Sequence, residues 1–502
     1  MDKAFLHKLK RIVGNQHVSF RPTDVEVYSY DASLEVQTPG AVVFPGSTEE
    51  VAALVQACLE AGVPYVPRGF GTNLSGGSVA PKDGLVICLS RLNRILDIHL
   101  KRRCAVVQPG LTNLELQNTL LPLGFFFAPD PASQKVATLG GNIAENSGGP
   151  HCLKYGVTRN HVLGLQVVLG DGEIVRLGES IHDDTEYNLC GFMIGSEGTL
   201  GIVTEAIVKI LPLAEAVITL LAIYDEVPKA AQSVSKIIAA GIIPATLEMM
   251  DAPIMRAVEA SAPSGYPLNA EAVLIIEVDG TKAGLAEQAD LIKRICRENG
   301  SRMVREAKDE AERDLLWSGR RGAFGAAARL APNFLTMDCT VPRTALPEAL
   351  RRVADIAKQY QLECGNVFHA GDGNLHPMLL FDARDQDQLK LVRQAGMDII
   401  EQCVALGGTI TGEHGVGLEK IEAMRFIFSE DDLDFQRSLK QVFDPQGILN
   451  PGKIIPAPIQ RDVTPEPSDR IGQDKFDLIP ADEKEACEMV CWAFKNLTVM
   501  NP

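Results

Sequence analysis

The stretch PRGFGTNLSGG, residues 67–77, follows the apolar segment VPYVP (63–67) and precedes GLVICL (84–89), and both segments are typical of β-strands. Its four glycines in eleven residues allow successive backbone N–H groups to face one side, a geometry that binds phosphate oxygens. A P-loop is excluded, because Gly77 and Ser78 follow Gly76 where Lys is required, and no long helix follows Gly71 as in a dinucleotide-binding turn. The residues alone leave two interpretations open, a structural turn and a phosphate site.

Two more glycine-rich polar stretches occur in the same half of the chain. They are PDPASQKVATLGGNIAENSGG (129–149) and GSEGTLGIVT (195–204). Three such loops in one domain predict a long phosphate-bearing ligand, and a dinucleotide fits that description.

The segments around these loops predict an α+β protein. Residues 41–45, 63–67, 84–89, 104–110, 163–177 and 200–212 are typical of strands, with a hairpin turn at Asp171-Gly172 and a helix over 48–62. After Pro212 the order strand, helix, strand, helix (218–225, 227–240, 272–280, 283–298) indicates a second α+β domain. Further helices are expected at 346–359, 386–405 and 431–443, with strands ending at 369 and starting at 376.

Composition limits the class of protein and its environment. The 502 residues are enough for two or three domains, and a net charge of −17 disfavours nucleic acid but allows a small anionic ligand at a local positive site. The eleven cysteines form no CxxC pair, which favours reduced thiols and a cytoplasmic location. No apolar run is long enough to span a membrane, so any membrane association is expected to go through a partner.

A second motif, HAGDGNLHP (369–377), places His369 and His376 on either side of a Gly-Asp-Gly-Asn turn. TGEHGVG (411–417) adds Glu413 and His414 in another glycine-rich loop. Two histidines and one carboxylate with open positions are typical of a catalytic divalent metal site, and zinc, iron and manganese all suit these ligands. We therefore predict that His369, His376 and Glu413 bind a divalent metal, most readily zinc.

Seven motifs in one order resemble those of a known flavoprotein family. RGFGTNLSGG, PDPAS…TLGGNIAENSGG, HCLKYG (151–156) and GSEGTLGIVTE resemble the FAD-binding domain of vanillyl-alcohol-oxidase-type (PCMH-type) proteins. HAGDGNLHP, TGEHGVG and LNPGK (449–453) resemble the cap domain of its 2-hydroxyacid dehydrogenase branch, which includes FAD-linked subunits of glycolate oxidase and D-lactate dehydrogenases.

The resemblance implies a fold and a division into domains. The expected α+β fold is a PCMH-type FAD-binding domain of two subdomains, followed by an α+β cap domain with an antiparallel sheet. The expected boundaries are 1–215 for the FAD-binding domain with its N-terminal helix and 216–456 for the substrate-binding cap. Residues 457–502, Pro-rich at first and helix-like over 482–497, are expected to be a linker and a docking tail.

The resemblance also implies which residues bind FAD. The first loop, from Arg68 to Gly77, would hold the pyrophosphate, and the other two would line the adenosine, ribityl and ring portions. Because this loop has no histidine, through which some relatives attach flavin, noncovalent FAD is expected. The predicted cofactor residues are Arg68, Gly69, Gly71, Thr72, Asn73, Leu74, Gly76, Gly77, Pro129, Ser133, Thr138, Gly140, Gly141, Asn142, Asn146, Gly149, Glu197, Gly198, Ile202 and Asn450.

The activity that the resemblance implies is oxidation of a small D-2-hydroxy acid to the 2-oxo acid, with hydride transfer to flavin N5. A metal bound to the substrate hydroxyl lowers its pKa, so that an imidazole can take the proton at neutral pH. His414 resembles the family's general base, Asn374 its substrate-contacting Asn, and Arg320 in WSGRRGAF (317–324) its carboxylate-binding arginine. Arg321 is expected to be an exposed charge on a helix face.

One departure bears on the substrate. D-2-hydroxyglutarate dehydrogenases carry a Lys for the second carboxylate in the strand that matches FLTMDCTVP (334–342), and this chain has Thr336 there. A monocarboxylate such as glycolate or D-lactate is therefore expected. No second nucleotide motif is present, which disfavours NAD as the electron acceptor. The resemblance implies that the electrons pass to an iron–sulfur or other electron-transfer subunit or to a quinone, since this chain has no cluster-type cysteine run.

Two other functions stay open at this stage. Two histidines and a glutamate could activate water in a metal-dependent hydrolase, which would leave the three glycine-rich loops unexplained. A noncatalytic flavin subunit of a larger complex would keep the fold without turnover.

Overall fold

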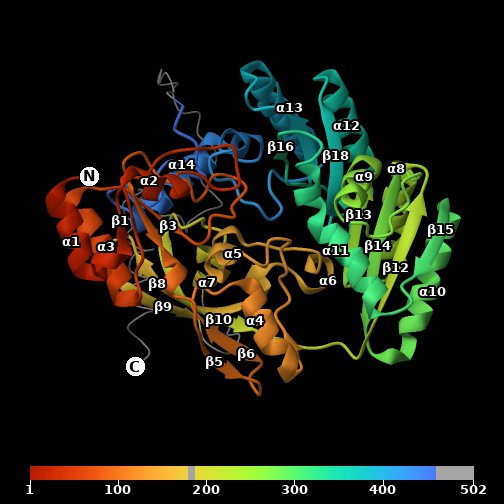
Figure 1. Ribbon diagram of the computed structural model, residues 1–502, viewed down its shortest axis with the longest axis horizontal. Helices are drawn as coiled ribbons and strands as arrows, with labels where there is room; N and C mark the ends of the chain where they lie inside the picture. The colour runs from red at the N-terminus through yellow and green to blue at the C-terminus, as the bar shows by residue number, and fades with distance from the viewer. Residues whose placement is uncertain (179–186, 460–502) are drawn as a thin grey trace, which may run out of the picture.

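The computed structural model describes residues 1–178 and 187–459, arranged as two α+β parts side by side (Figure 1). The predicted tail helix over 482–497 lies outside the described residues. The first part begins with a small sheet of order β1-β2-β4-β3, in which β4 pairs in parallel with β2 and β3. Its elements are α1 (Lys3–Val13), β1 (Val18–Ser19), α2 (Pro22–Val25), β2 (Ala41–Val43), α3 (Thr48–Ala61), β3 (Tyr65–Arg68) and β4 (Leu85–Cys88). These elements confirm the strands and the helix predicted between residues 41 and 89.

An antiparallel sheet of order β5-β6-β10-β8-β9 completes the first part. Gly172, with φ of 86°, makes the predicted turn between β8 and β9. The sheet consists of β5 (Ile95–His99), β6 (Cys104–Val107), β8 (Val162–Leu169), β9 (Ile174–Gly178) and β10 (Gly201–Lys209). The helices here are α4 (Asn113–Leu120), α5 (Leu139–Glu145), α6 (Cys152–Tyr155) and α7 (Leu189–Met193), and β7 (Phe125–Phe126) pairs with β11 (Leu211–Pro212).

The second part is built on a nine-stranded sheet whose described pairs are all antiparallel. Its strands are β12 (Ala216–Tyr224), β13 (Thr246–Asp251), β14 (Ala272–Gly280), β15 (Ser301–Glu306), β16 (Asn333–Thr336), β17 (Cys339–Thr340), β18 (Glu363–His369), β19 (Asn374–Leu375) and β20 (Pro377–Phe381). The sequence predicted β12, β14, β18 and β20 but missed β13, the strand between β14 and β18.

Helices cover both faces of this sheet, so a central strand such as β14 is apolar on both sides. Leu274 and Ile276 point to one core, and Val273 and Ile275 point to the other, because side chains alternate along a strand. The first face carries α8 (Val227–Ala239), α10 (Lys282–Glu298), α12 (Leu346–Gln359) and α13 (Gln386–Ala405). The second face carries α9 (Ala252–Ser261) and α11 (Glu310–Ala327).

After α13 the chain returns to the first part (Figure 1). Phe443, at the end of α14 (Glu430–Phe443), packs in the core of the five-stranded sheet, and Leu449 packs in the core of the small sheet. Tyr65 N donates to the Ile448 carbonyl, and Asn450 N donates to the Tyr65 carbonyl. The architecture confirms the predicted fold class. The domain boundaries 1–215, 216–456 and 457–502 stay predictions, and the last part of the second range packs on the first domain.

Candidate active site

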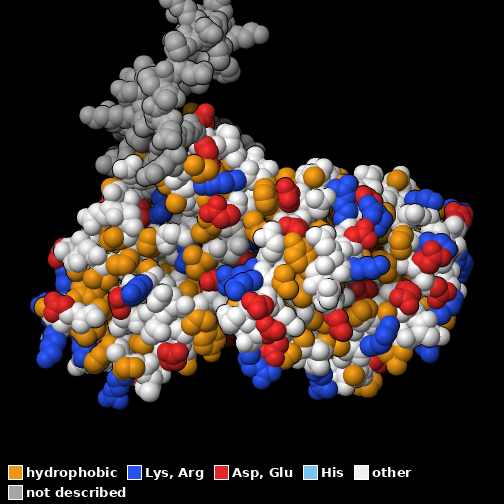
Figure 2. Space-filling view, turned by 90° about the horizontal axis from the view of Figure 1, so that it is seen from above, with side chains coloured by type: hydrophobic (Ala, Val, Ile, Leu, Met, Phe, Trp, Pro, Cys, Tyr) orange, Lys and Arg blue, Asp and Glu red, His pale blue; other side chains and the backbone are white. Residues whose placement is uncertain are grey.

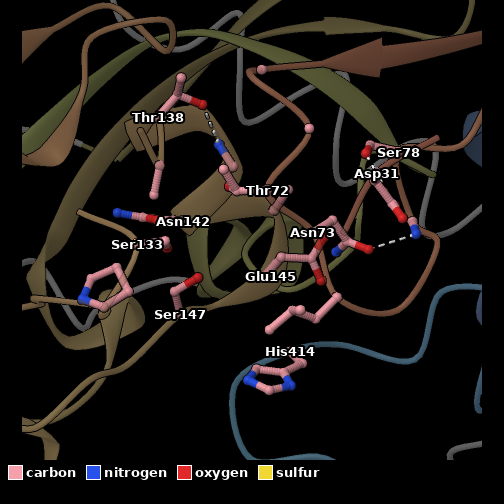
Figure 3. A pocket seen from close by; sticks show the side chains of 18 of the residues that line it. Asp31, Thr72, Asn73, Ser78, Ser133, Thr138, Asn142, Glu145, Ser147 and His414 are labelled. Carbon is pink, nitrogen blue, oxygen red and sulfur yellow. Dashed lines mark hydrogen bonds between the residues drawn. The ribbon is translucent and has the colours of Figure 1, made fainter. Parts of the chain in front are cut away.

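A cavity of about 740 Å³ lies between the two parts and is lined by all three glycine-rich loops. The FAD-binding side contributes residues from 67–78, 131–147 and 196–203, among others. The cap contributes Arg320, Arg321, Phe324, Phe334, His369, His376, Glu413 and His414, among others. Figure 3 shows His414 on the cap loop facing Asn73 and Glu145 across this space.

The loops are held by their own polar side chains. Asn73 Oδ1 accepts from Ser75 N at 2.9 Å and from Gly77 N at 2.8 Å. Thr138 caps α5 by accepting from Gly141 N at 3.3 Å (Figure 3). A Cβ at Gly69 would overlap Thr138 Oγ1, so the first two loops meet where only glycine fits. The shape of the first two loops is therefore set by these side-chain hydrogen bonds and by the close contact at Gly69.

Most of the predicted cofactor residues line this cavity. They are Arg68, Gly69, Gly71, Thr72, Asn73, Leu74, Gly77, Ser133, Thr138, Gly140, Gly141, Asn142, Glu197, Gly198 and Ile202. Arg68 is only 5% exposed, and its guanidinium donates to the carbonyls of Tyr30 (2.7 Å) and Ser78 (3.2 Å). These hydrogen bonds of the Arg68 guanidinium hold the first glycine-rich loop in place.

The five other predicted cofactor residues, Gly76, Pro129, Asn146, Gly149 and Asn450, are not among the lining residues of the described chain. Asn450 Nδ2 donates to the carbonyls of Gly77 (3.1 Å) and Glu197 (2.7 Å), so it ties the first loop to the third. Asn146 ends α5 in the left-handed conformation, and its Oδ1 accepts from Arg159 N. Asn450 and Asn146 thus hold the loops and do not line the cavity.

The cap loop 411–417 reaches into the FAD-binding side. Val416 N and Gly417 N donate to the two carboxylate oxygens of Glu197, at 2.6 and 2.8 Å. Glu413 Oε2 accepts from Gly148 N at 3.2 Å, which links the predicted metal ligand to the second glycine-rich loop. Residues more than two hundred positions apart therefore meet at one point.

Two buried carboxyl groups lie beneath this loop. Burial and the neighbouring carboxylate of Glu197 raise the pKa of Glu145 well above its ordinary value. Burial likewise raises the pKa of Glu197 to about 7, although the hydrogen bonds from Val416 and Gly417 lower it. A Cβ at Gly415 would overlap Glu145 and lie 2.7 Å from Glu197 Oε1, so the loop needs glycine there.

Asp338 fixes the backbone of the same loop. It is fully buried and accepts from Thr411 Oγ1 at 2.6 Å, Gly412 N at 3.0 Å and His414 N at 2.8 Å. The buried ammonium of Lys420 lies 3.3 Å from Asp338 Oδ2. The motifs predict no role for Asp338, although it stands two positions after Thr336 in FLTMDCTVP (334–342).

The three predicted metal ligands and His414 converge. His369 Nε2 lies 3.0 Å and His376 Nε2 lies 3.3 Å from the same Glu413 oxygen, Oε1. The rings of His376 and His414 stack with centroids 4.8 Å apart. The groups His369–His376–Glu413 and Asp338–His376–His414 each have the ligand atoms to hold a metal ion.

The protonation of this centre follows from its neighbours. Burial alone would lower the pKa of His369, but the carboxylates of Glu248 and Glu413 outweigh it and raise that pKa well above its ordinary value. Burial would raise the pKa of Glu413, but the histidines around it hold it at about 2. Burial lowers the pKa of His414 to about 4, so its imidazole is neutral at pH 7.

Arg320 lines the cavity, and its guanidinium also forms a buried ion pair with Glu248. Its Nε and Nη2 contact Glu248 Oε2 at 2.8 and 2.6 Å. The sequence did not predict Glu248; the available signal was a carboxylate inside the otherwise apolar stretch around 247–250. Arg321 is exposed as expected, stacks its guanidinium on Trp317, and also lines the cavity.

Asn374 is not among the residues that line the cavity in the described part of the chain. It pairs with His369 across β18 and β19 and lies against Gly412, where an added Cβ would be 2.6 Å from its side chain. Its Oδ1 is buried and has no hydrogen-bond partner in the described residues. Its role in substrate contact stays a prediction.

Comparison with known proteins defines the class. Residues 39–178 match the family described as FAD binding domain, and residues 213–454 match FAD linked oxidases, C-terminal domain. The chain is 45% identical over 442 residues to the glycolate oxidase subunit GlcD of Bacillus subtilis, covering 88% of this chain and 94% of that protein. It is 44% identical to GlcD of Escherichia coli K12 (86% and 88% covered) and 32% identical to D-lactate dehydrogenase of Archaeoglobus fulgidus (90% and 99%).

Solved structures show the same fold at greater distance. p-Cresol methylhydroxylase superposes with a TM-score of 0.76 at 15% identity, covering 90% of this chain and 96% of that one. The family matches and the glycolate oxidase and D-lactate dehydrogenase relatives define an FAD-dependent oxidoreductase. The chain belongs to the family of FAD-linked oxidases, as the seven motifs predicted. Among the described helices, none is long and apolar enough to cross a membrane.

Proposed function

We propose that this protein oxidises a small D-2-hydroxy acid, glycolate or D-lactate, to the 2-oxo acid with noncovalent FAD and a divalent metal. The observation that carries the proposal is convergence. A histidine–carboxylate centre and a buried arginine line the same cavity as three glycine-rich loops. The relatives named glycolate oxidase subunit and D-lactate dehydrogenase support this substrate class.

The residues present fit FAD. The cavity is long enough to involve all three loops, and a Cβ at Gly69 would overlap Thr138 Oγ1, so the first two loops approach each other closely there. The first loop offers no histidine for covalent attachment, which supports noncovalent binding. Bound FAD would accept the hydride from the substrate carbon at N5.

The residues also fit a divalent metal. Neither ring nitrogen of the buried His376 has a hydrogen-bond partner in the described residues, and its Nε2 faces Glu413 Oε1. The ring nitrogen Nε2 and the carboxylate oxygen Oε1 both carry lone pairs, so at 3.3 Å they need a proton or a cation between them. His369, His376 and Glu413 would hold the ion, with zinc, iron and manganese all suited to these ligands. Such an ion would lower the pKa of the substrate hydroxyl.

The chain's own groups supply the proton transfer and the orientation. His414, neutral at pH 7, would accept the hydroxyl proton, and its Nδ1 is buried without a hydrogen-bond partner in the described residues. Arg320 would bind the substrate carboxylate, because Glu248 occupies only one edge of its guanidinium. The carboxylate would thus be anchored beside the histidine centre.

The walls of the cavity favour a small monocarboxylate. The Phe324 ring lies 6.3 Å from the His376 ring and 6.2 Å from the Phe334 ring, which forms an aromatic wall against the centre. Thr336, on the same strand as Phe334, is buried and brings no charge, but it is not among the described residues that line the cavity. Besides Arg320, the only Arg or Lys side chain that the cap contributes to the described lining is the exposed Arg321.

We further propose that electrons leave through an iron–sulfur or other electron-transfer subunit or a quinone; the relatives are named as subunits of glycolate oxidase, which supports a partner subunit. Figure 2 shows Lys and Arg side chains interspersed with Asp and Glu on the face seen from above. Attraction of the anionic substrate is assigned to Arg320, because this guanidinium lines the cavity. A cytoplasmic location, with membrane association only through a partner, stays a prediction.

Anaerobic bleaching of the flavin tests the proposal directly. Glycolate or D-lactate should bleach the purified protein, L-lactate should not, and a chelator should slow the reaction. H376A should keep its FAD but lose bleaching, whereas H99A, which removes a surface histidine, should bleach at the wild-type rate. Normal bleaching by H376A would contradict the metal role. If no D-acid bleaches the flavin, a noncatalytic flavin subunit is favoured. If the purified protein is colourless, a metal-dependent hydrolase is favoured.

A further inference from the structure

A buried glutamate connects the two halves of the proposed site. Glu248 is 1% exposed and lies on β13, between the strands that carry Glu277 and His369. His369 Nδ1 is 2.8 Å from its Oε1, and the guanidinium of Arg320 is 2.6 Å from its Oε2. One carboxylate thus contacts a predicted metal ligand and the predicted substrate-binding arginine.

Both ring nitrogens of His369 face carboxylates: Nδ1 lies against Glu248, and Nε2 lies against Glu413 Oε1. An ionised carboxylate only accepts hydrogen bonds, so both nitrogens carry a proton in this arrangement. A metal ion at the centre would take the place of the proton on Nε2, and Glu248 would keep the N–H on Nδ1. Histidine ligands of metals are commonly oriented by such a carboxylate partner.

The same carboxylate also holds Arg320 in place. Arg320 is 2% exposed and comes from α11, an element that the sequence separates from β13 by about sixty residues. Because Arg320 donates to Oε2 while His369 donates mainly to Oε1, neither partner can move without disturbing the other. Both partners are donors, so an amide with one acceptor oxygen cannot satisfy them together.

We propose that Glu248 is a positioning residue that couples metal binding to recognition of the substrate carboxylate. This inference rests on the proposed function. It adds that one side chain, which does not line the cavity, sets both the ligating nitrogen of His369 and the direction of Arg320. Removing the Glu248 carboxylate should therefore weaken the binding of both the metal ion and the substrate carboxylate.

The structure offers a matched control. Glu277 is also buried and lies on the neighbouring strand β14, and its carboxylate accepts from Arg313 Nε at 2.8 Å and Nη2 at 2.9 Å. Arg313 stands seven residues before Arg320 on α11, on the same helix face. E277Q thus breaks an equivalent Glu–Arg pair that touches no site residue.

The test uses the full-length, FAD-bound protein, stripped of metal and titrated with Zn²⁺ against a competing chelator. E248Q should bind Zn²⁺ about 10–100-fold more weakly than wild type. It should also need about tenfold more pyruvate, the product of D-lactate oxidation, to perturb the flavin absorbance. E277Q should match the wild type in both titrations, although its thermal midpoint falls.

The outcomes separate this inference from the proposed function. Wild-type affinity for Zn²⁺ in E248Q, or equal losses in E248Q and E277Q, would overturn the coupling role. If the wild type itself binds no Zn²⁺ and is not bleached, the proposed function fails instead. Should E248Q not fold, E248D keeps the charge but is one methylene shorter. It should show a weaker loss in both titrations, and unchanged affinities in E248D would overturn the inference.

Discussion

Replacing Asp338 by Asn should loosen the loop that carries Glu413 and His414. Asn keeps the volume of Asp, and its one oxygen can replace Oδ2, which accepts from Gly412 N and His414 N, but its NH2 group would then face the donor Glu413 N. The change also leaves the ammonium of Lys420, 1% exposed, without its counter-charge.

The magnitude follows from these contacts. A lost hydrogen bond to a charged group costs about 1.5–3 kcal/mol, and breaking a buried ion pair from one side costs about 3–5 kcal/mol. Both values describe removal of the same charge, so they are not added. D338N should lower the free energy of unfolding by about 3–5 kcal/mol, a large part of a typical total of about 5–15 kcal/mol.

Urea denaturation followed by tryptophan fluorescence measures the loss, since Trp317 lies in the cap core. D382N is the control: it removes a half-buried carboxylate that pairs with the exposed Arg384 at the surface, and it should change the curve little. Adding K420M to D338N should restore part of the stability, because the unpaired buried ammonium is removed. A loss below about 1 kcal/mol for D338N, the ordinary size for a point mutation, would refute this account of the loop.

Three further outcomes are expected. Hydrogen bonds from Arg313, Thr219 and Trp317 outweigh burial and lower the pKa of Glu277, so its stabilisation is complete above about pH 4.3 and is lost as the pH falls further. The difference in thermal midpoint between wild type and E277Q should therefore shrink from pH 7 to pH 3, and a constant difference would contradict it. G415A, at a φ of 83° and against Glu145, should cost at least about 1–2 kcal/mol in urea denaturation. F334A should raise kcat/KM for a branched D-2-hydroxy acid relative to D-lactate by about tenfold, and an unchanged ratio would exclude the aromatic wall as a size filter.

Much of the fold could be predicted because local patterns agreed with it. The apolar stretch 272–280 and the helix pattern 386–405 match β14 and α13. The strand β13 was missed, since it is only six residues long and Glu248 interrupts its apolar residues Leu247, Met249 and Met250. Likewise, the sequence does not indicate that α14 packs against the first part, because Phe443 is buried there among residues that lie far away in the chain.

The sequence by itself determined the residue types of the site: glycines where backbones must approach closely, and the histidines and the glutamate that can bind a cation. Only the tertiary structure decided their partners. Asp338, Glu248 and Asn450 act on groups far away in the chain, and a buried charge or amide is stable only where the fold supplies a matching donor or acceptor. Such matches depend on distances in space, which spacing along the chain does not encode.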